Sequence, residues 1–374
     1  MDSNFNTSQP TMNKTVGNSS DLSTCRLMEV SGHPFFTVTY SMVFLVGLVL
    51  NSFTVRVYFC RAKRPHSSVT VYLQNLAASD FFLSLCLPLR IANYANPNST
   101  LVRHVYCNFG ATAFYLNMYA SILFMDYIAA NRYLKIVRPL ETHALQRVRA
   151  ARYISMATWA TLFTVSSIYL IISLNTTWGT KPNSEAMGCD AFHTSNLRLL
   201  YKIVHSFSAA IFFFVLVSLL LLYCSTVRKL RGAQKRQISC GTSKMLSRSK
   251  RNMLVLVAVF CVCFVPYHLV RLPYAYLRSH LHNCALQQAF YYLKELTVLL
   301  SVLNACLDPL IYFIFCKAFR SQLGLKRGLS VTTTHAVSTT PRLEGRRINL
   351  RKTITLPGTP TRTSFNMLRR ATIT

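Results

Sequence analysis

Two basic residues in apolar surroundings are the first candidates for chemistry. Arg271 lies three residues after His268 and three before Tyr274, so on a helix these side chains share a broad stripe and can line one wall of a cavity. Lys294 adds a second cation in the next apolar segment. Two cations that face a semi-enclosed pocket repel each other unless an anion neutralises them, and the guanidinium fork suits phosphate or carboxylate. The pattern predicts a binding site for an anionic ligand.

An internal ion pair is the competing interpretation. Glu295 follows Lys294 and could neutralise either Lys294 or Arg271. Adjacent residues on a helix point in different directions, so we expect Glu295 to border the ligand site without cancelling its charge.

Asp80 and Asp126 are acids that lie in the middle of apolar segments. An ionisable group in hydrocarbon costs about 2.5–3.5 kcal/mol on insertion scales unless it has a partner. Asp80 and Asp126 both carry this cost, and the sequence pattern names no partner for Asp126. The sequence contains no nucleophile–base arrangement, zinc-ligand cluster or glycine-rich phosphate loop, so we expect neither enzymatic activity nor a structural metal.

The composition indicates a membrane protein. The chain has 374 residues, of which 51% are hydrophobic and 14% are charged, with a formal net charge of +30. Soluble domains contain about 25% charged residues, and a membrane span needs about 20 mainly apolar residues. Seven segments qualify, namely 36–60, 69–94, 105–134, 153–174, 200–227, 251–278 and 290–316.

The loops give the orientation. Lys and Arg accumulate in the connectors after the first, third and fifth spans and after the seventh, as is typical of cytoplasmic loops. The opposite side carries the N-glycosylation triplets at Asn6, Asn13, Asn18, Asn98 and Asn175. We therefore expect a multi-pass plasma-membrane protein with its N-terminus outside. The basic excess then faces anionic lipid headgroups of the bilayer, and nucleic acid is not needed to explain it.

The predicted organisation has four parts. Residues 1–34 form a glycosylated extracellular segment and 35–316 the seven-helix membrane domain. A short amphipathic helix follows at 317–328, and 329–374 is a Thr-, Ser-, Arg- and Pro-rich cytoplasmic tail that we expect to be disordered.

Specific motifs then point to a family. They are Asn51 in LVLNS, Asp80 in NLAASD, Asn131-Arg132-Tyr133 at the end of the third span, Trp159, FCVCFVP ending at Pro266, and NACLDPLIY over 304–312. Their combination resembles the rhodopsin-like G-protein-coupled receptors across 36–328. The resemblance implies an all-α, seven-transmembrane helix bundle with a short amphipathic eighth helix. It also implies a heterotrimeric G protein as partner, the inhibitory class first, with arrestin and receptor kinases at the tail.

Within that class, residues 263–274 and 291–309 look like the purinergic nucleotide receptors of the ADP and UDP-sugar branch, and the middle of the chain also looks like the neighbouring lysophosphatidylserine receptor. A nucleotide or nucleotide sugar is the first expectation, and a lysophospholipid is the alternative. His205 and Tyr201 depart from the Asn and His with which the ADP receptor holds its ligand. A channel or transporter predicts a continuous polar stripe through the spans, which the sequence lacks.

The resemblance also implies individual roles. Tyr115 matches a position that stacks on the ligand. A sodium ion as allosteric cofactor is implied at Asp80, Ser121, Asn304 and Asp308. The coupling residues are Asn131, Arg132, Tyr133, Tyr223 and Tyr312, and the implied disulfides are Cys107–Cys189 and Cys25–Cys284. Asn131 stands where most relatives have an acid that pairs with the adjacent arginine, which predicts raised ligand-independent signalling.

Overall fold

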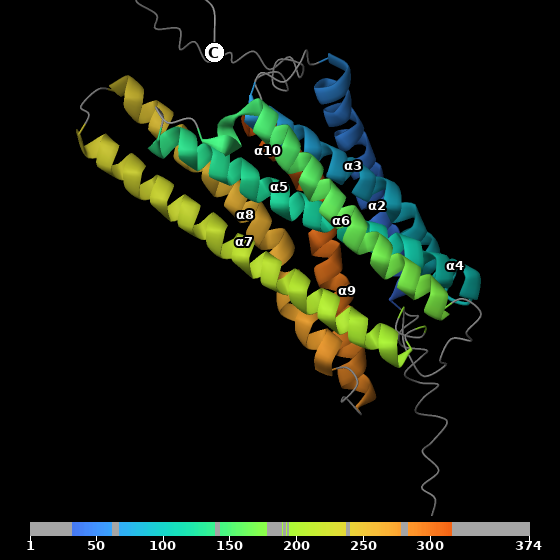
Figure 1. Cartoon of the computed structure of the whole chain (residues 1–374). Helices are drawn as coiled ribbons and strands as arrows, with labels where there is room; N and C mark the ends of the chain where they lie inside the picture. The colour runs from blue at the N-terminus through green and yellow to red at the C-terminus, as the bar shows by residue number, and fades with distance from the viewer. Residues whose placement is uncertain are drawn as a thin grey trace, which may run out of the picture. The chain divides into compact units, whose positions relative to one another are not determined.

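The computed structural model describes residues 32–61, 67–138, 143–177, 189, 192, 194–236, 240–277 and 283–315. All of them belong to one compact unit, Met1–Lys326. The described part is helical, without a β-strand (Figure 1). Its elements are α2 His33–Val55, η1 Arg56–Arg61, α3 Ser68–Ala95, α4 Thr100–Val105, η2 Tyr106–Gly110, α5 Ala111–Val137, η3 Ala144–Gln146, α6 Val148–Thr177, α7 Ser195–Arg236, α8 Cys240–Leu277, α9 Cys284–Val302 and α10 Asn304–Phe315.

Each of the seven predicted spans is a helix in the structure. The first continues from α2 into η1, and the seventh is divided between α9 and α10 at Leu303. The amide of Asn51 on α2 donates to the carbonyl of Ala305, 2.9 Å away, and so ties α2 to the chain just after this division. The fifth span is longer than predicted, since α7 covers Ser195–Arg236.

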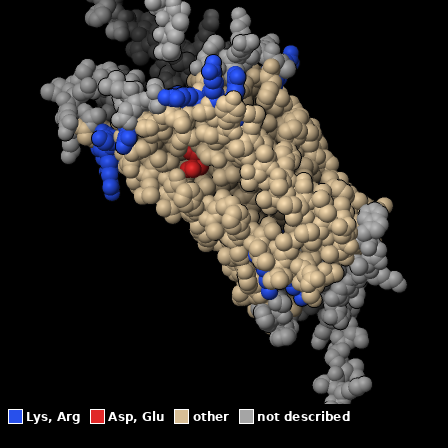
Figure 2. All heavy atoms as spheres, viewed as in Figure 1, with Lys and Arg blue, Asp and Glu red and all other residues tan. Residues whose placement is uncertain are grey.

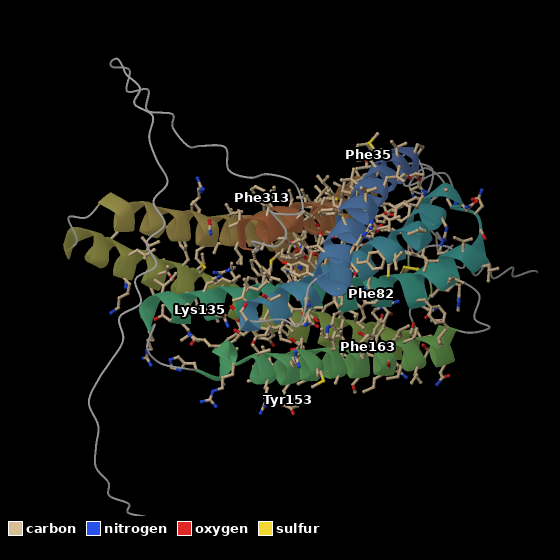
Figure 3. All side chains as sticks on the ribbon, turned by 90° about the horizontal axis from the view of Figure 1, so that it is seen from above. Phe35, Phe82, Lys135, Tyr153, Phe163 and Phe313 are labelled. Atoms are coloured by element: carbon tan, nitrogen blue, oxygen red, sulfur yellow. A yellow bond between two sulfur atoms is a disulfide. The ribbon has the colours of Figure 1, made fainter. Side chains whose placement is uncertain are left out.

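The outside of the bundle suits a bilayer. Within the part of the chain that the structure describes, six helices are long and apolar enough to cross a membrane. Phe35, Phe82, Tyr153 and Phe163 project from the bundle and are more than half exposed (Figure 3). Figure 2 shows the basic side chains at the two ends of a face that is neutral between them apart from one acidic spot. Apolar side chains that point outward between two basic ends are the pattern of a membrane-spanning bundle.

The seventh long helix, α5, is less apolar because it is enclosed by protein. It packs against α3, α6, α7 and α8. Its side chains Ile122, Phe124, Met125 and Ile128 are fully buried. A helix that faces other helices on most sides can carry polar residues that a lipid-facing helix cannot.

Several predicted features lie outside the described residues. These are the N-terminal segment with Asn6, Asn13 and Asn18, the amphipathic helix 317–328 and the tail 329–374. Asn98 and Asn175 are described and exposed, one between α3 and α4 and the other in the last turn of α6.

Candidate ligand site

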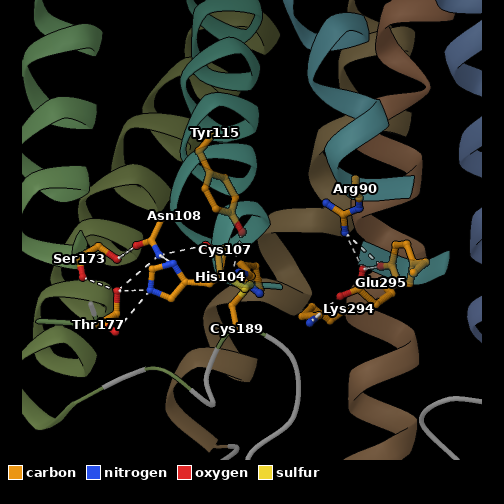
Figure 4. Close-up of a disulfide and its surroundings, with 12 residues drawn as sticks. Arg90, His104, Cys107, Asn108, Tyr115, Ser173, Thr177, Cys189, Lys294 and Glu295 are labelled. Carbon is orange, nitrogen blue, oxygen red and sulfur yellow. Dashed lines mark hydrogen bonds and ion pairs between the residues drawn. A yellow bond between two sulfur atoms is a disulfide. The ribbon is translucent and has the colours of Figure 1, made fainter. Parts of the chain in front are cut away.

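A cavity of about 200 Å³ opens between the helices at the end that carries the Cys107–Cys189 disulfide. This disulfide confirms one predicted pairing and joins η2 to the segment that precedes α7 (Figure 4). Both cysteines line the cavity. The further lining side chains used below are Arg90, Tyr115, Leu162, Val165, Tyr201, His205, Phe207, Ile211, Arg271, Lys294 and Glu295.

Arg271 on α8 is held by aromatic side chains. Its Nη2 donates to the Tyr115 hydroxyl oxygen, 2.8 Å away. The guanidinium carbon lies 5.2 Å from the ring centroid of Tyr201 and 5.8 Å from that of Tyr274. Its Nε is buried and has no hydrogen-bond partner. No acidic side chain of the described residues lies within ion-pair distance of Arg271, so its charge is not neutralised there.

Lys294 on α9 is different, and here the expectation from sequence is wrong. Its Nζ lies 2.7 Å from Oε1 of Glu295. Adjacent helix positions do point apart, but the flexible four-carbon lysine stem lets the ammonium reach back to the neighbouring carboxylate. Lys294 also lies 4.4 Å from the ring centroid of Tyr291. Lys294 therefore forms the internal ion pair while it still lines the cavity.

Sequence reasoning missed Arg90 on α3. Its Nη2 lies 2.6 Å from Oε2 of Glu295, which also accepts a hydrogen bond from the Tyr94 hydroxyl (Figure 4). The guanidinium lies 4.8 Å from the ring centroid of Tyr40. The sequence did contain a signal for Arg90, because an arginine within an apolar membrane span needs a partner. The described lining therefore contains three cations, Arg90, Lys294 and Arg271, and one carboxylate, that of Glu295. The cavity is electropositive as a result.

The predicted stripe on α8 contributes only one residue to the cavity wall. His268 lies outside the lining, where its ring stacks on Phe212 with centroids 3.7 Å apart and its Nε2 lies 3.1 Å from the Tyr119 hydroxyl. Tyr274 is 2% exposed and also lies outside the lining. Residues three positions apart differ in direction by about 60° around the helix axis, because three residues turn the helix by about 300°. His268 and Tyr274 therefore point away from Arg271 and are buried by neighbouring helices.

The wall next to Arg271 contains Tyr201 and His205, the two residues at which the sequence departs from the family resemblance. The rings of Tyr201 and His205 lie 4.0 Å apart, and His205 meets Tyr115 edge-on at 5.4 Å. Tyr115 itself lines the cavity. These rings offer flat surfaces beside a cation, an arrangement suited to an aromatic or apolar ligand group next to an anionic one.

A second polar cluster lies deeper, around Asp80. Ser121 Oγ donates to its Oδ1 at 3.2 Å, and the Tyr312 hydroxyl donates to its Oδ2 at 2.6 Å. Asn304 donates to Oδ2 of Asp308 at 2.9 Å, while the remaining side-chain oxygens of Asn304 and Asp308 are buried without hydrogen-bond partners. Asp80 and Asp308 are both fully buried in this cluster. Two facing buried carboxyl groups need a proton or a cation between them, and these oxygens fit a small hard cation such as sodium.

At the other end of α5, Asn131 makes contacts that the sequence did not reveal. Its Nδ2 donates to Ser68 Oγ at 2.7 Å and to the Leu145 carbonyl at 2.6 Å, while its own oxygen has no partner. The side chain therefore joins α3, α5 and η3 instead of bonding the Arg132 guanidinium. Tyr133 on α5 and Tyr223 on α7 are half-buried.

Asp126 does have a partner. Ser218 Oγ on α7 donates to its Oδ1 at 3.0 Å. The pairing of Cys25 with Cys284 lies outside the described residues, since α9 begins at Cys284 but the placement of that side chain is not described.

Comparison with known proteins agrees with this architecture. Residues 50–312 match the model of the 7 transmembrane receptor (rhodopsin family). Purinoceptor 14 of Bos taurus is 33% identical over 301 residues, which cover 79% of this chain and 86% of that protein. Purinoceptor 13 of Homo sapiens is 30% identical over 80% and 83% of the two chains, and probable G-protein coupled receptor 34 of Pan troglodytes is 27% identical over 80% and 77%.

The chain belongs to the rhodopsin family of seven-transmembrane receptors. It is a multi-pass membrane receptor of the G-protein-coupled class and not an enzyme, as the sequence predicted. Its relatives lie in the branch that contains purinoceptors 13 and 14 and G-protein coupled receptor 34.

Proposed function

We propose that this receptor is activated by an extracellular ligand with a phosphate or similar anionic group, which binds Arg271. The observation that carries the proposal is a guanidinium that faces a cavity, has a buried Nε without a partner, and meets no carboxylate among the described residues. Arginine binds phosphate through paired charge-assisted hydrogen bonds. Tyr115 already orients the guanidinium through its hydroxyl.

A nucleotide or nucleotide sugar is the first candidate. The rings of Tyr115, Tyr201 and His205 lie beside Arg271, so a base could stack on them while its phosphates meet the guanidinium. The names of two relatives, both purinoceptors, also support this candidate. His205 and Tyr201 would then hold the nucleotide differently from the residues of the ADP receptor.

A lysophospholipid is the second candidate, and the apolar part of the cavity lining supports it. Four apolar side chains of α6 and α7 belong to the lining and are here called the apolar arm, namely Leu162, Val165, Ile211 and Phe207. Phe207 is also 65% exposed on the outside of α7. An acyl chain needs such an arm, whereas a nucleotide leaves it empty.

A ligand panel with two variants separates the candidates. Cells with a G-protein sensor would receive nucleoside diphosphates, UDP-sugars and lysophospholipids. Removing a charge-assisted contact through Arg271→Ala should lower the potency of any active anion by about ten- to hundredfold. Leu162→Trp fills the apolar arm and should abolish activation by lysophospholipids while leaving the potency of nucleotides nearly unchanged. Unchanged potency in Arg271→Ala at matched surface expression contradicts the proposal for both candidates.

Signalling is proposed to follow the family mechanism. The ligand shifts a two-state bundle, α8 moves outward at Pro266, and a cleft opens beside Arg132 for a heterotrimeric G protein of the inhibitory class. In this mechanism Tyr223 and Tyr312 move into that cleft, and Tyr312 leaves Asp80. The receptor works at the plasma membrane with its N-terminus outside, and arrestin and receptor kinases act on its tail.

A further inference from the structure

Asp126 is an acid that the ligand site, the Asp80 cluster and the G-protein end do not use. It lies on α5 six residues before Arg132, about 9 Å along the helix axis. Among the described residues, Asp80, Glu295 and Asp308 are buried, and Asp126 is the acid that is partly exposed. Figure 2 shows one acidic spot on the otherwise neutral face of the bundle.

The surroundings of Asp126 make its one hydrogen bond important. Ser218 Oγ donates to Oδ1 at 3.0 Å, and the other carboxyl oxygen has no hydrogen bond to a described residue. The lipid-facing residues beside Ser218 are apolar, with Val217 54% and Leu221 62% exposed. Hydrocarbon offers no replacement donor, so separation of α5 from α7 at this level would leave the carboxyl group without a partner.

Asp126 also lies on the same helix stripe as the ligand site. Tyr115, Tyr119 and Asp126 are spaced by four and seven residues, close to one and two helical turns. Tyr115 bonds Arg271 and Tyr119 lines the cavity. A rigid helix therefore connects the cavity wall to Asp126 over about 16 Å, at a rise of about 1.5 Å per residue.

The cytoplasmic half of α8 packs into the bundle. Met253 and Leu256, on the cytoplasmic half of α8, are 1% and 0% exposed and belong to the common core. A bond that exists in this arrangement and is lost when α7 shifts against α5 stabilises the closed state.

We propose that the Asp126–Ser218 hydrogen bond is a latch between α5 and α7 that holds the receptor closed until ligand binding moves the α5 wall of the cavity. The latch differs from the contacts of Asn131, which join α5 to α3 and η3 at the cytoplasmic end. The Asp126–Ser218 bond lies inside the membrane-spanning part of the bundle and joins α5 to α7, two helices that line the ligand cavity.

A double-mutant cycle tests the latch. Asp126→Leu, Ser218→Ala and the double variant would be compared for ligand-independent G-protein activation at equal surface density, with sensors for every G-protein class. Interhelical hydrogen bonds in membranes shift an equilibrium by roughly threefold, and at most about twentyfold. We expect each single variant to raise basal activity by that amount and the double variant to resemble the singles. Asp126→Asn keeps an acceptor oxygen and should stay near the natural level, as should the lipid-facing control Val217→Ala.

A second readout does not depend on G protein. Spin labels at Lys135→Cys on α5 and Arg251→Cys on α8, both exposed, report the distance between the cytoplasmic halves of these helices. The purified receptor would carry serine in place of Cys60, Cys224, Cys240 and Cys316, so that the labels attach to the two introduced cysteines. Asp126→Leu and Ser218→Ala should each increase the population with the longer distance. The latch is refuted if both variants leave this population unchanged, if only Asp126→Leu changes it, or if the two effects are additive.

Discussion

Two walls of one cavity carry cations, but their partners differ. On the α8 wall, Arg271 is surrounded by tyrosines and meets no carboxylate of the described residues. On the α3 and α9 wall, Arg90 and Lys294 share Glu295. A cation with an internal partner contributes to folding, whereas a cation without a carboxylate is available to a ligand. Cations that look equivalent in the sequence therefore have different roles: Arg90 and Lys294 form internal ion pairs, whereas Arg271 is available to a ligand.

The largest expected effect comes from Arg90. Breaking a buried ion pair by removing one partner costs about 3–5 kcal/mol, so Arg90→Ala should lower the thermal stability of the purified receptor strongly and reduce its surface expression. Arg271→Ala should leave thermal stability nearly unchanged, because no carboxylate loses its partner. Thermal unfolding of both variants with Arg90→Lys as the charge-conserving control measures the difference. Equal destabilisation by the two alanine variants would remove the distinction between the walls.

The two cations should also differ in ligand potency. Lys294→Ala removes a charge that Glu295 already offsets, so we expect a potency loss of less than about tenfold, against about ten- to hundredfold for Arg271→Ala. Concentration–response curves at matched surface density, for whichever ligand class activates the receptor, give both values. A larger loss for Lys294→Ala would mean that the ligand displaces Glu295 from the lysine.

The Asp80 cluster allows the same comparison for buried acids, which also need a partner for their charge. A sodium ion between Asp80 and Asp308 should stabilise the closed receptor, because a ligand that binds one state shifts the equilibrium toward it. We expect thermal stability of the purified receptor to rise when sodium replaces a large organic cation at constant ionic strength, and Asp80→Asn to abolish the rise. A sodium-dependent rise that persists in Asp80→Asn places the ion elsewhere.

The smallest effect is expected at Asn131. An acid at this position would add a charge interaction with Arg132 worth about 0.2–1 kcal/mol, but Asn131→Asp also deprives the Leu145 carbonyl of its donor. We expect the aspartate variant to have lower basal activity by less than about sixfold. The test is to measure basal G-protein activation of Asn131→Asp and of the natural receptor at equal surface density. Equal basal activity would show that the contacts of Asn131 with Ser68 and Leu145 already hold the closed state.

The amino-acid sequence is enough to predict the seven spans and the family, because runs of about 20 apolar residues and motifs such as NACLDPLIY are local features of the chain. It also named Arg271, Tyr115 and the Asp80 cluster as candidates through their motif positions. The disulfide Cys107–Cys189 followed from the family resemblance.

Only the tertiary structure decided which charges are neutralised. Arg90 and Glu295 are 205 residues apart, and Asp126 and Ser218 are 92 apart, so no local pattern could pair them. The same holds for the burial of His268 and Tyr274 beside the cavity. A span's apolar pattern specifies that a helix crosses the membrane, but its rotation and its neighbours follow from packing of the whole bundle. The partner of each polar side chain is set by that packing.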